Sequence, residues 1–230
     1  MSLQTKQSHF YYEQPLFAVT TDIVVFTIRH QHLSVLLVNR SGTQKVEHWS
    51  LPGGFLGQHE NLRQCANRQL EEQTGVKEDV YLEQLYTFGD IDENPSQRII
   101  NVAYYTLIPC ERIQLNLKTT EKSVGWFAMN ELPAMSPEHE KIVKKAKQRL
   151  VSKLDYSTIA FQFMKPEFTL GELQTVYQSI LQEPIDKRNF RKRILALNCI
   201  EETGNVHRNG RHRPAKLFRL IDPNRVEIIK

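Results

Sequence analysis

Residues 54–76 bring acidic and amide side chains together in a segment with glycine near both ends. The run GFLGQHENLRQCANRQLEEQTGV contains three glutamates together with Gln69 and Gln73. Carboxylate oxygens are the ligands that Mg²⁺ prefers, and the bound metal neutralises phosphate charge and lowers the pKa of an attacking water. A glutamine oxygen is a neutral, weaker ligand and cannot act as a base. Gln69 and Gln73 therefore weaken any metal site that they share with Glu72.

The spacing of this segment resembles the Nudix box. The matching positions are Gly54, Glu60, Arg68, Leu70, Glu72, Gly75 and Val76, with Leu51-Pro52-Gly53 before them and Trp126-Phe127 after them. The resemblance implies an α/β (α+β) sandwich, in which helices cover a mixed sheet, and Mg²⁺-dependent cleavage of a diphosphate linked to a nucleoside. The family's box has acids at the positions of Gln69, Glu72 and Gln73. Two of those three acids are replaced here by side chains of nearly the same shape.

We therefore expect a pocket that binds a nucleoside diphosphate without cutting it. No catalytic residue and no metal ligand is assigned, and Mg²⁺ is not expected to be required; residual hydrolysis stays open. Glu71 lies on a different helix face from Glu72 and does not replace the missing acids. Two alternatives remain: a pocket that is only scaffold, and an active ADP-ribose pyrophosphatase with a nucleic-acid-binding tail.

The candidate pocket residues combine the box with nearby cations and an aromatic ring. Arg40 and Arg98 flank the expected strands, and arginine offers a bidentate fork to phosphate oxygens. Tyr86, Phe88, Tyr104 and Tyr105 are candidates for stacking on a base, and each is equally well interpreted as a core residue. The predicted ligand-binding set is Arg40, Gly53, Gly54, Glu60, Arg68, Glu72, Phe88 and Arg98.

Positive charge is concentrated in the last third of the chain. Residues 1–150 hold 16 Lys and Arg against 17 Asp and Glu, whereas residues 151–230 hold 14 against 9. Residues 187–219 alone hold 10 basic and 2 acidic side chains. Such a block indicates a polyanionic partner when it lies on one surface.

The order of elements around this block predicts a winged helix-turn-helix. Thr169 and Glu172 form a capping-box pattern before one helix, Pro184 interrupts the chain, and Asp186 can cap a helix over 187–198. A hairpin over 200–208 and 215–220, with an Asn-Gly turn, follows. The second helix is expected to enter the major groove. The predicted DNA-binding residues are Lys187, Arg188, Asn189, Arg191, Lys192, Arg193, Arg208, Arg211, His212 and Arg213.

Within this set we expect a division of roles. Asn189 and Arg191 are the better candidates for base edges, because asparagine reads adenine and arginine reads guanine. Lys187, Lys192 and Arg193 suit phosphates. An RNA-binding module is a third class of function, although no RNA-binding motif is visible.

Earlier in the chain, β-branched and aromatic runs predict strands over 17–29, 33–39, 80–88, 99–108 and 124–129. Helices are expected over 61–74, with Gly75 at the C-terminal cap, and over 136–154. These elements divide the chain into an effector-binding domain over 1–153 and a DNA-binding domain over 154–230.

The segments TLGELQTVYQSIL, DKRNFRKRILAL and RHRPAKLFR, placed after the Nudix-like part, resemble the Nudix-related transcriptional regulators of NAD metabolism, the NrtR-like family. The resemblance implies a bacterial repressor that acts as a homodimer. It also implies a palindromic double-stranded DNA operator near genes of NAD biosynthesis or recycling. ADP-ribose or a related NAD-derived nucleotide is the implied effector.

The composition agrees with a globular protein. Hydrophobic residues make up 40% of the 230 residues, and no apolar run approaches the roughly 20 residues of a membrane span. The N-terminus lacks the pattern of a signal peptide, and the three cysteines are isolated from one another. We therefore expect a cytoplasmic location and no membrane partner.

Overall fold

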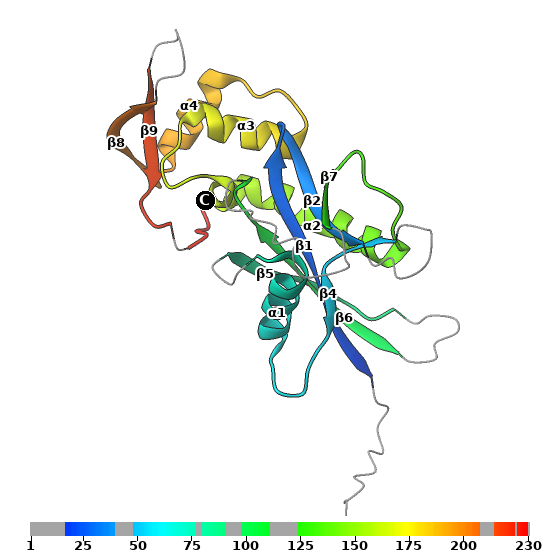
Figure 1. Ribbon diagram of the computed structural model, residues 1–230. Coiled ribbons are helices and arrows are strands. Elements are labelled where there is room, and N and C mark those ends of the chain that lie inside the picture. The colour runs from blue at the N-terminus through cyan, green and yellow to red at the C-terminus, as the bar shows by residue number, and fades with distance from the viewer. Residues whose placement is uncertain are drawn as a thin grey trace, which may run out of the picture.

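The computed structural model describes residues 17–39, 48–76, 80–90, 98–110, 124–207, 214–223 and 225–229 (Figure 1). Its first part is a seven-stranded mixed sheet. The strands are β1 (Ala18–Arg29), β2 (His32–Asn39), β3 (Trp49–Ser50), β4 (Gly53–Phe55), β5 (Tyr81–Phe88), β6 (Ile99–Leu107) and β7 (Val124–Ala128). The main strand order is β3-β2-β1-β6-β5, with β4 paired to β1 and β7 to β2. β1 runs parallel to β6 and antiparallel to β2 and β4.

Alternate side chains of β1 face opposite layers of the molecule. Ile23 and Val25 pack in the cluster that contains Leu70 of α1 (Leu62–Thr74). Val24 and Phe26 pack in the cluster that contains residues of α2 (Pro137–Tyr156). Because successive strand residues point to opposite faces, the two helices cover the two faces of the sheet. The predicted helix–sheet–helix sandwich is confirmed.

Both helices begin where the sequence predicts. Asn61 caps α1 through a capping box with Gln64, and Gly75 ends it in the left-handed conformation with φ of 75°. Ser136 caps α2, and proline occupies its first turn, where no backbone N–H is needed. The strands β3 and β4 were not predicted. They have only two and three residues, on either side of or within Pro52-Gly53-Gly54, and strands that short carry no periodic pattern.

The second part contains the predicted helix-turn-helix and hairpin. Its elements are the 3₁₀ turn η2 (Ile159–Phe163), α3 (Leu170–Leu181), α4 (Lys187–Ala196), β8 (Ile200–His207) and β9 (Ala215–Leu220). The Thr169–Glu172 capping box and the Asp186 cap are both present. α4 ends two residues earlier than expected, and Asn198 takes a positive φ of 52° on the way into β8. The hairpin turn lies outside the described residues.

One apolar core runs through both parts. The cluster that includes Phe26 of β1 and Leu150 of α2 continues to Phe168, Phe190 and Phe218 of the helix–hairpin part. The C-terminal segment also returns to the end of α2, where it pairs by backbone hydrogen bonds with Tyr156 and Thr158. Figure 1 shows α2 passing beneath the sheet toward α3. No described helix is both long and apolar enough to cross a membrane.

Candidate functional site

The loop before α1 holds Glu60 against the helix. The Gly57 amide donates to Glu60 Oε1 at 2.7 Å. Arg68 Nη2 and Nε donate to the two oxygens of the same carboxylate at 2.6 and 2.9 Å. The guanidinium beside Glu60 lowers the pKa of this carboxyl to about 2. Glu60 is therefore a structural anion that closes the loop onto α1.

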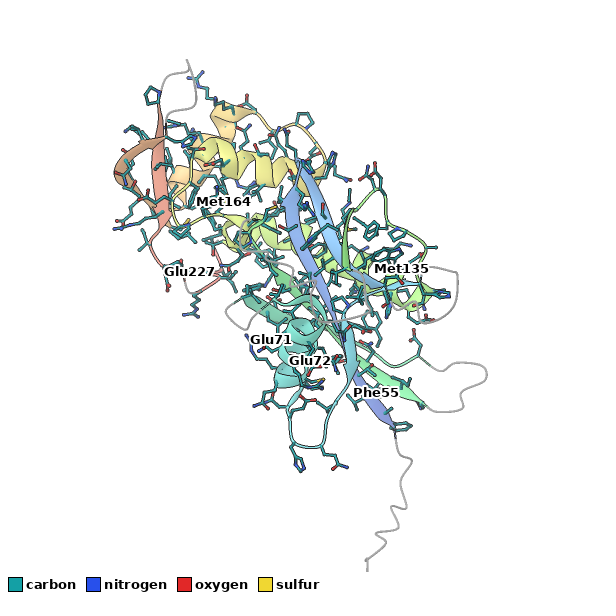
Figure 2. All side chains as sticks on the ribbon, viewed as in Figure 1. Phe55, Glu71, Glu72, Met135, Met164 and Glu227 are labelled. Carbon is teal, nitrogen blue, oxygen red and sulfur yellow. The ribbon has the colours of Figure 1, made fainter. Side chains whose placement is uncertain are left out.

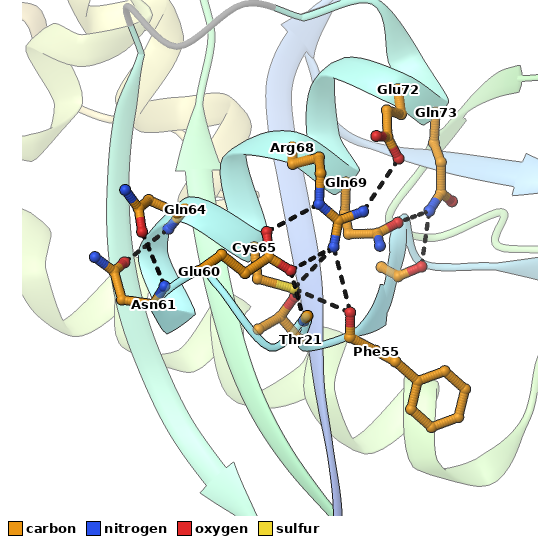
Figure 3. Close-up of polar contacts among 12 residues, drawn as sticks. Thr21, Phe55, Glu60, Asn61, Gln64, Cys65, Arg68, Gln69, Glu72 and Gln73 are labelled. Atoms are coloured by element: carbon orange, nitrogen blue, oxygen red, sulfur yellow. Dashed lines mark hydrogen bonds and ion pairs between the residues drawn. The ribbon is translucent and has the colours of Figure 1, made fainter. Parts of the chain in front are cut away.

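Arg68 also binds the next acid of the helix. Its Nη1 lies 3.2 Å from Glu72 Oε2, and its Nη2 donates to the Phe55 carbonyl at 3.3 Å (Figure 3). The Glu72 side chain is 57% exposed. Arg68 thus pairs with both Glu60 and Glu72, the two acids that match the Nudix box.

The amides of Gln69 and Gln73 lie together at the positions where the Nudix resemblance implies acids. Gln73 Nε2 donates to the Gly53 carbonyl at 2.7 Å and to Gln69 Oε1 at 2.5 Å (Figure 3). If the oxygen and nitrogen of the Gln69 amide exchange places, its oxygen accepts from Arg68 Nη1 at 2.9 Å. Gln73 Oε1 is buried without a hydrogen-bond partner among the described residues. The amide pair ties α1 to β4 and adds no negative charge.

The carboxylate and amide oxygens of the box do not form a ligand set that suits Mg²⁺. Within the described residues, no group of three or more His, Cys, Asp or Glu side chains is placed to hold a metal ion. Glu60 and Glu72 are both paired with Arg68, and the amide oxygens are neutral. Figure 2 shows Glu71 beside Glu72 on α1, and Glu71 is exposed. No step of a metal-assisted reaction can be derived from this set.

A buried polar cluster lies beneath the box, and the sequence reasoning missed it. Asp22 of β1 is only 7% exposed and accepts from Asn101 Nδ2 of β6. His139 Nε2, at the start of α2, lies 3.5 Å from Asp22 Oδ2, and His139 Nδ1 accepts from the Leu51 amide at 3.4 Å. Asn101 Oδ1 is buried without a described partner. The signal available in the sequence was the one acidic residue of β1, which directly precedes the buried apolar run Ile23–Phe26.

Gly53 allows the box to approach this cluster. A Cβ at this position would meet Asp22 Oδ1 at 2.1 Å and the Thr21 carbonyl at 2.3 Å. At Gly54 it would meet the Gln69 amide at 2.5 Å. The two glycines therefore serve close packing of β4 against β1 and α1.

The predicted aromatic candidates divide between core and surface. Tyr105 is fully buried and Tyr104 is 5% exposed, so both are core residues. Phe88 packs edge-on against the half-exposed Tyr86, with ring centroids 5.2 Å apart. The register places Phe88 opposite Asn101, one strand away from β1. Phe88 is thus level with β4 along the sheet, but its side chain packs on the face that α2 covers, opposite the face that α1 covers.

Arg98 lies at the edge of this region. Its guanidinium stands 5.0 Å over the Phe17 ring, and Nη2 lies 3.4 Å from the Gly89 carbonyl. Arg40 lies outside the described residues.

The second group of predicted residues lies on α4. Lys187, Arg188, Asn189, Arg191, Lys192 and Arg193 are all exposed. Phe190 and Ile194 face inward, and Phe190 packs edge-on against Tyr177 of α3 at 5.1 Å. The apolar side fixes the helix and leaves a cationic face open. The predicted wing residues Arg208, Arg211, His212 and Arg213 lie outside the described residues.

Two family descriptions match the chain. Residues 16–146 match the NUDIX domain, and residues 160–220 match the NrtR DNA-binding winged helix domain. The chain is 34% identical over 213 residues to the "ADPR responsive transcriptional repressor NtrR" of Acinetobacter baylyi, covering 91% of this chain and 83% of that protein. The chain belongs to the NrtR family. A Nudix-related regulator, as the sequence motifs predicted, is thereby confirmed.

Solved NrtR structures agree with the fold. The crystal structure of Shewanella oneidensis NrtR complexed with a 27mer DNA matches with a TM-score of 0.75 and 33% identity, over 88% of this chain and 93% of that one. The Nudix domain of the same protein, complexed with ADP ribose, matches with a TM-score of 0.50 and 30% identity, over 60% of this chain and 90% of that one. The Nudix fold with a C-terminal winged helix is confirmed.

Proposed function

We propose that this NrtR protein is a bacterial DNA-binding transcriptional repressor whose Nudix domain binds ADP-ribose or a related NAD-derived nucleotide. The observation that carries the proposal is the pair of Gln69 and Gln73 amides, which bond to each other and to the Gly53 carbonyl where a metal-dependent box would need carboxylates. An exposed cationic helix in the same chain gives ligand binding something to control. The genes controlled would be those of NAD biosynthesis or recycling.

The effector pocket is proposed to lie between the box and the β5–β6 edge. The Shewanella Nudix domain that shares this fold was solved with ADP ribose, which supports a nucleoside diphosphate as ligand. The proposed contacts are Arg40, Gly53, Gly54, Glu60, Arg68, Glu72, Phe88 and Arg98. Within this set, Arg68 and Glu60 shape the loop through their ion pair. Mg²⁺ is not required in this scheme, because ligand binding needs no attacking water.

The DNA contacts are proposed to come from α4 and the hairpin. Asn189 and Arg191 are proposed to read base edges, and Lys187, Lys192 and Arg193 suit phosphates by their charge. Arg188 lies on the same exposed face of α4. Arg208, Arg211, His212 and Arg213 are proposed to extend the contact from the wing. A homodimer would present two such helices to a palindromic operator, since a twofold protein matches a twofold site.

The proposed effector and DNA sites are separate. Each ligand can therefore weaken the binding of the other only if the protein has two states that bind the ligands with different affinity. ADP-ribose releases the operator if it binds the DNA-competent arrangement more weakly than the other. The proposed boundary between residues 153 and 154, at the end of α2, divides the effector domain (1–153) from the DNA-binding domain (154–230). The segment 150–168 is the proposed moving junction. We expect the protein to act in the cytoplasm.

The test combines a DNA-binding assay with a hydrolysis assay. The full chain should shift promoter DNA of the organism's own NAD genes at physiological salt, and ADP-ribose should reverse the shift. Arg191→Ala should lose discrimination between operator and unrelated DNA, by about 1–3 kcal/mol, whereas Lys192→Ala should lose affinity for both alike. Equal and uniform losses would contradict this division of roles.

Hydrolysis of ADP-ribose is expected to be absent or very slow with Mg²⁺ or Mn²⁺. Turnover near the ~10 s⁻¹ of a typical enzyme would overturn the sensor interpretation and favour a pyrophosphatase. The double variant Gln69→Glu/Gln73→Glu asks whether only the two carboxylates are missing. The matched control Gln64→Glu changes an exposed amide of the same helix and should not create activity.

A further inference from the structure

Arg193 differs from the other cations of α4 in its partners. Its Nη2 donates to the Leu154 carbonyl at 3.2 Å and lies 3.6 Å from Asp155 Oδ1. Its guanidinium also stands 6.0 Å from the ring centre of Tyr177 in α3. The recognition helix is therefore joined to the C-terminal end of α2 by one side chain.

The end of α2 is a suitable acceptor for this cation. The last carbonyls of a helix lack partners within it and carry partial negative charge. Lys153 O is satisfied by the Ser157 amide and hydroxyl at 2.9 and 2.7 Å, and Tyr156 O by the Ile229 amide at 2.7 Å. Leu154 O accepts from Arg193. The guanidinium thus satisfies one of the last carbonyls of the helix that connects the two domains.

The rest of α2 is fixed to the Nudix sheet. Near its C-terminal end, Lys153 pairs with Glu83 of β5, and Arg149 lies 3.5 Å from the same carboxylate. At its N-terminal end, His139 reaches Asp22 and the Leu51 amide, directly beside Gly53. α2 therefore begins under the proposed effector pocket and ends at Arg193. A shift of the C-terminal end of α2 would reach α4 through this contact.

We propose that Arg193 is a positioning residue that holds α4 against the end of α2 and passes the state of the effector pocket to the recognition helix. This inference rests on the proposed function. It also separates Arg193 from the phosphate contacts, where the sequence placed it. The Arg193 side chain is 48% exposed and follows Phe190 by three residues, so it lies at the border between the buried side and the open cationic face of α4.

The experiment measures operator affinity against salt concentration, with and without saturating ADP-ribose, for the wild type, Arg193→Ala and Lys192→Ala. Loss of one phosphate contact lowers the slope of log K against log salt by about 0.9. Lys192→Ala should show this loss and keep the wild-type ratio of affinities with and without ADP-ribose. Arg193→Ala should keep the wild-type slope. Its ratio of operator affinities without and with ADP-ribose should fall to within about twofold of one, whereas such a coupling is typically 5–150-fold.

Arg193→Lys is the second variant, because it keeps the charge and removes the planar fork. A phosphate contact would survive this change with slope and ratio near wild type. A positioning residue would lose most of the effector ratio while keeping the slope. Either Arg193 variant with a reduced slope and an intact ratio overturns the proposal.

A readout without DNA separates this proposal from the proposed function. Hydrogen exchange of α4 amides should increase in Arg193→Ala and stay unchanged in Lys192→Ala. The reason is that Arg193, unlike Lys192, joins α4 to α2. Unchanged exchange in Arg193→Ala would overturn the positioning role. A wild type that binds no operator specifically, or ignores ADP-ribose, would refute the proposed function whatever α4 does.

Discussion

The Glu60 carboxylate shows how one ion pair holds the loop before α1 against the helix. It accepts from Arg68 twice and from the Gly57 amide once, and its side chain is 15% exposed. The charge of Glu60 is matched by Arg68, which agrees with a structural role.

This pair should appear in the pH dependence of stability. The folded pKa of Glu60 is about 2, below its ordinary value of 4.5. A lowered carboxyl pKa stabilises the folded state above pH 4.5, and that contribution is lost as the pH falls from 4.5 to about 2. The thermal midpoint of the wild type should therefore fall more steeply across this range than that of Glu60→Gln. The control Glu71→Gln, an exposed acid of the same helix, should follow the wild type; parallel curves for all three would contradict the assignment.

Gly53 and Gly54 are adjacent but should not tolerate alanine equally. The Cβ of Gly53→Ala would meet the Thr21 backbone carbonyl, which cannot move without β1, whereas that of Gly54→Ala meets the end of the flexible Gln69 side chain. Gly53→Ala should cost about 1–3 kcal/mol in urea unfolding, and Gly54→Ala less. Gly171→Ala is the control, because its Cβ would find its nearest neighbour at 3.7 Å. An equal loss of unfolding free energy at positions 53 and 54 would show that the β1 backbone moves to accommodate the new Cβ.

Among the elements, α3 begins at a capping box that stabilises its first turn. Thr169 Oγ1 accepts from the Glu172 amide at 3.1 Å, and Glu172 Oε2 accepts from the Thr169 amide at 2.7 Å. Thr169→Ala should lower the free energy of unfolding by about 1 kcal/mol in urea titrations. Thr175→Ala, an exposed threonine within the same helix, is the matched control and should cost less. A larger loss at Thr175 would mean that the cap is not the source of stability.

Periodic elements were predictable from the sequence because their apolar spacing follows the geometry of a helix or strand. α3, α4 and β1 were found in this way, with boundary errors such as the early end of α4. Asp22 was missed because a strand pattern does not reveal which polar partners lie on neighbouring strands. The contacts of Arg193 with Leu154 and Asp155 could not be predicted, because the sequence does not show which elements lie beside α4.

At the scale of the molecule, the two domains do not have separate cores. Phe26 of the sheet and Phe218 of the hairpin belong to one buried cluster, joined through Leu150 of α2 and Phe161 of η2. A core shared in this way resists independent unfolding of the winged helix. It also limits the movement that ADP-ribose can cause to a rearrangement at the junction, with most of the packing kept.

The shared core predicts that both domains unfold together. Both tryptophans, Trp49 and Trp126, lie in the Nudix sheet, so tryptophan fluorescence reports that domain alone, whereas circular dichroism includes α3 and α4. The two thermal transitions should coincide. ADP-ribose at 100 times its Kd should stabilise the folded state by about 2.7 kcal/mol, and both signals should shift together. A circular dichroism transition that precedes the fluorescence transition and ignores ADP-ribose would show that the winged helix unfolds independently.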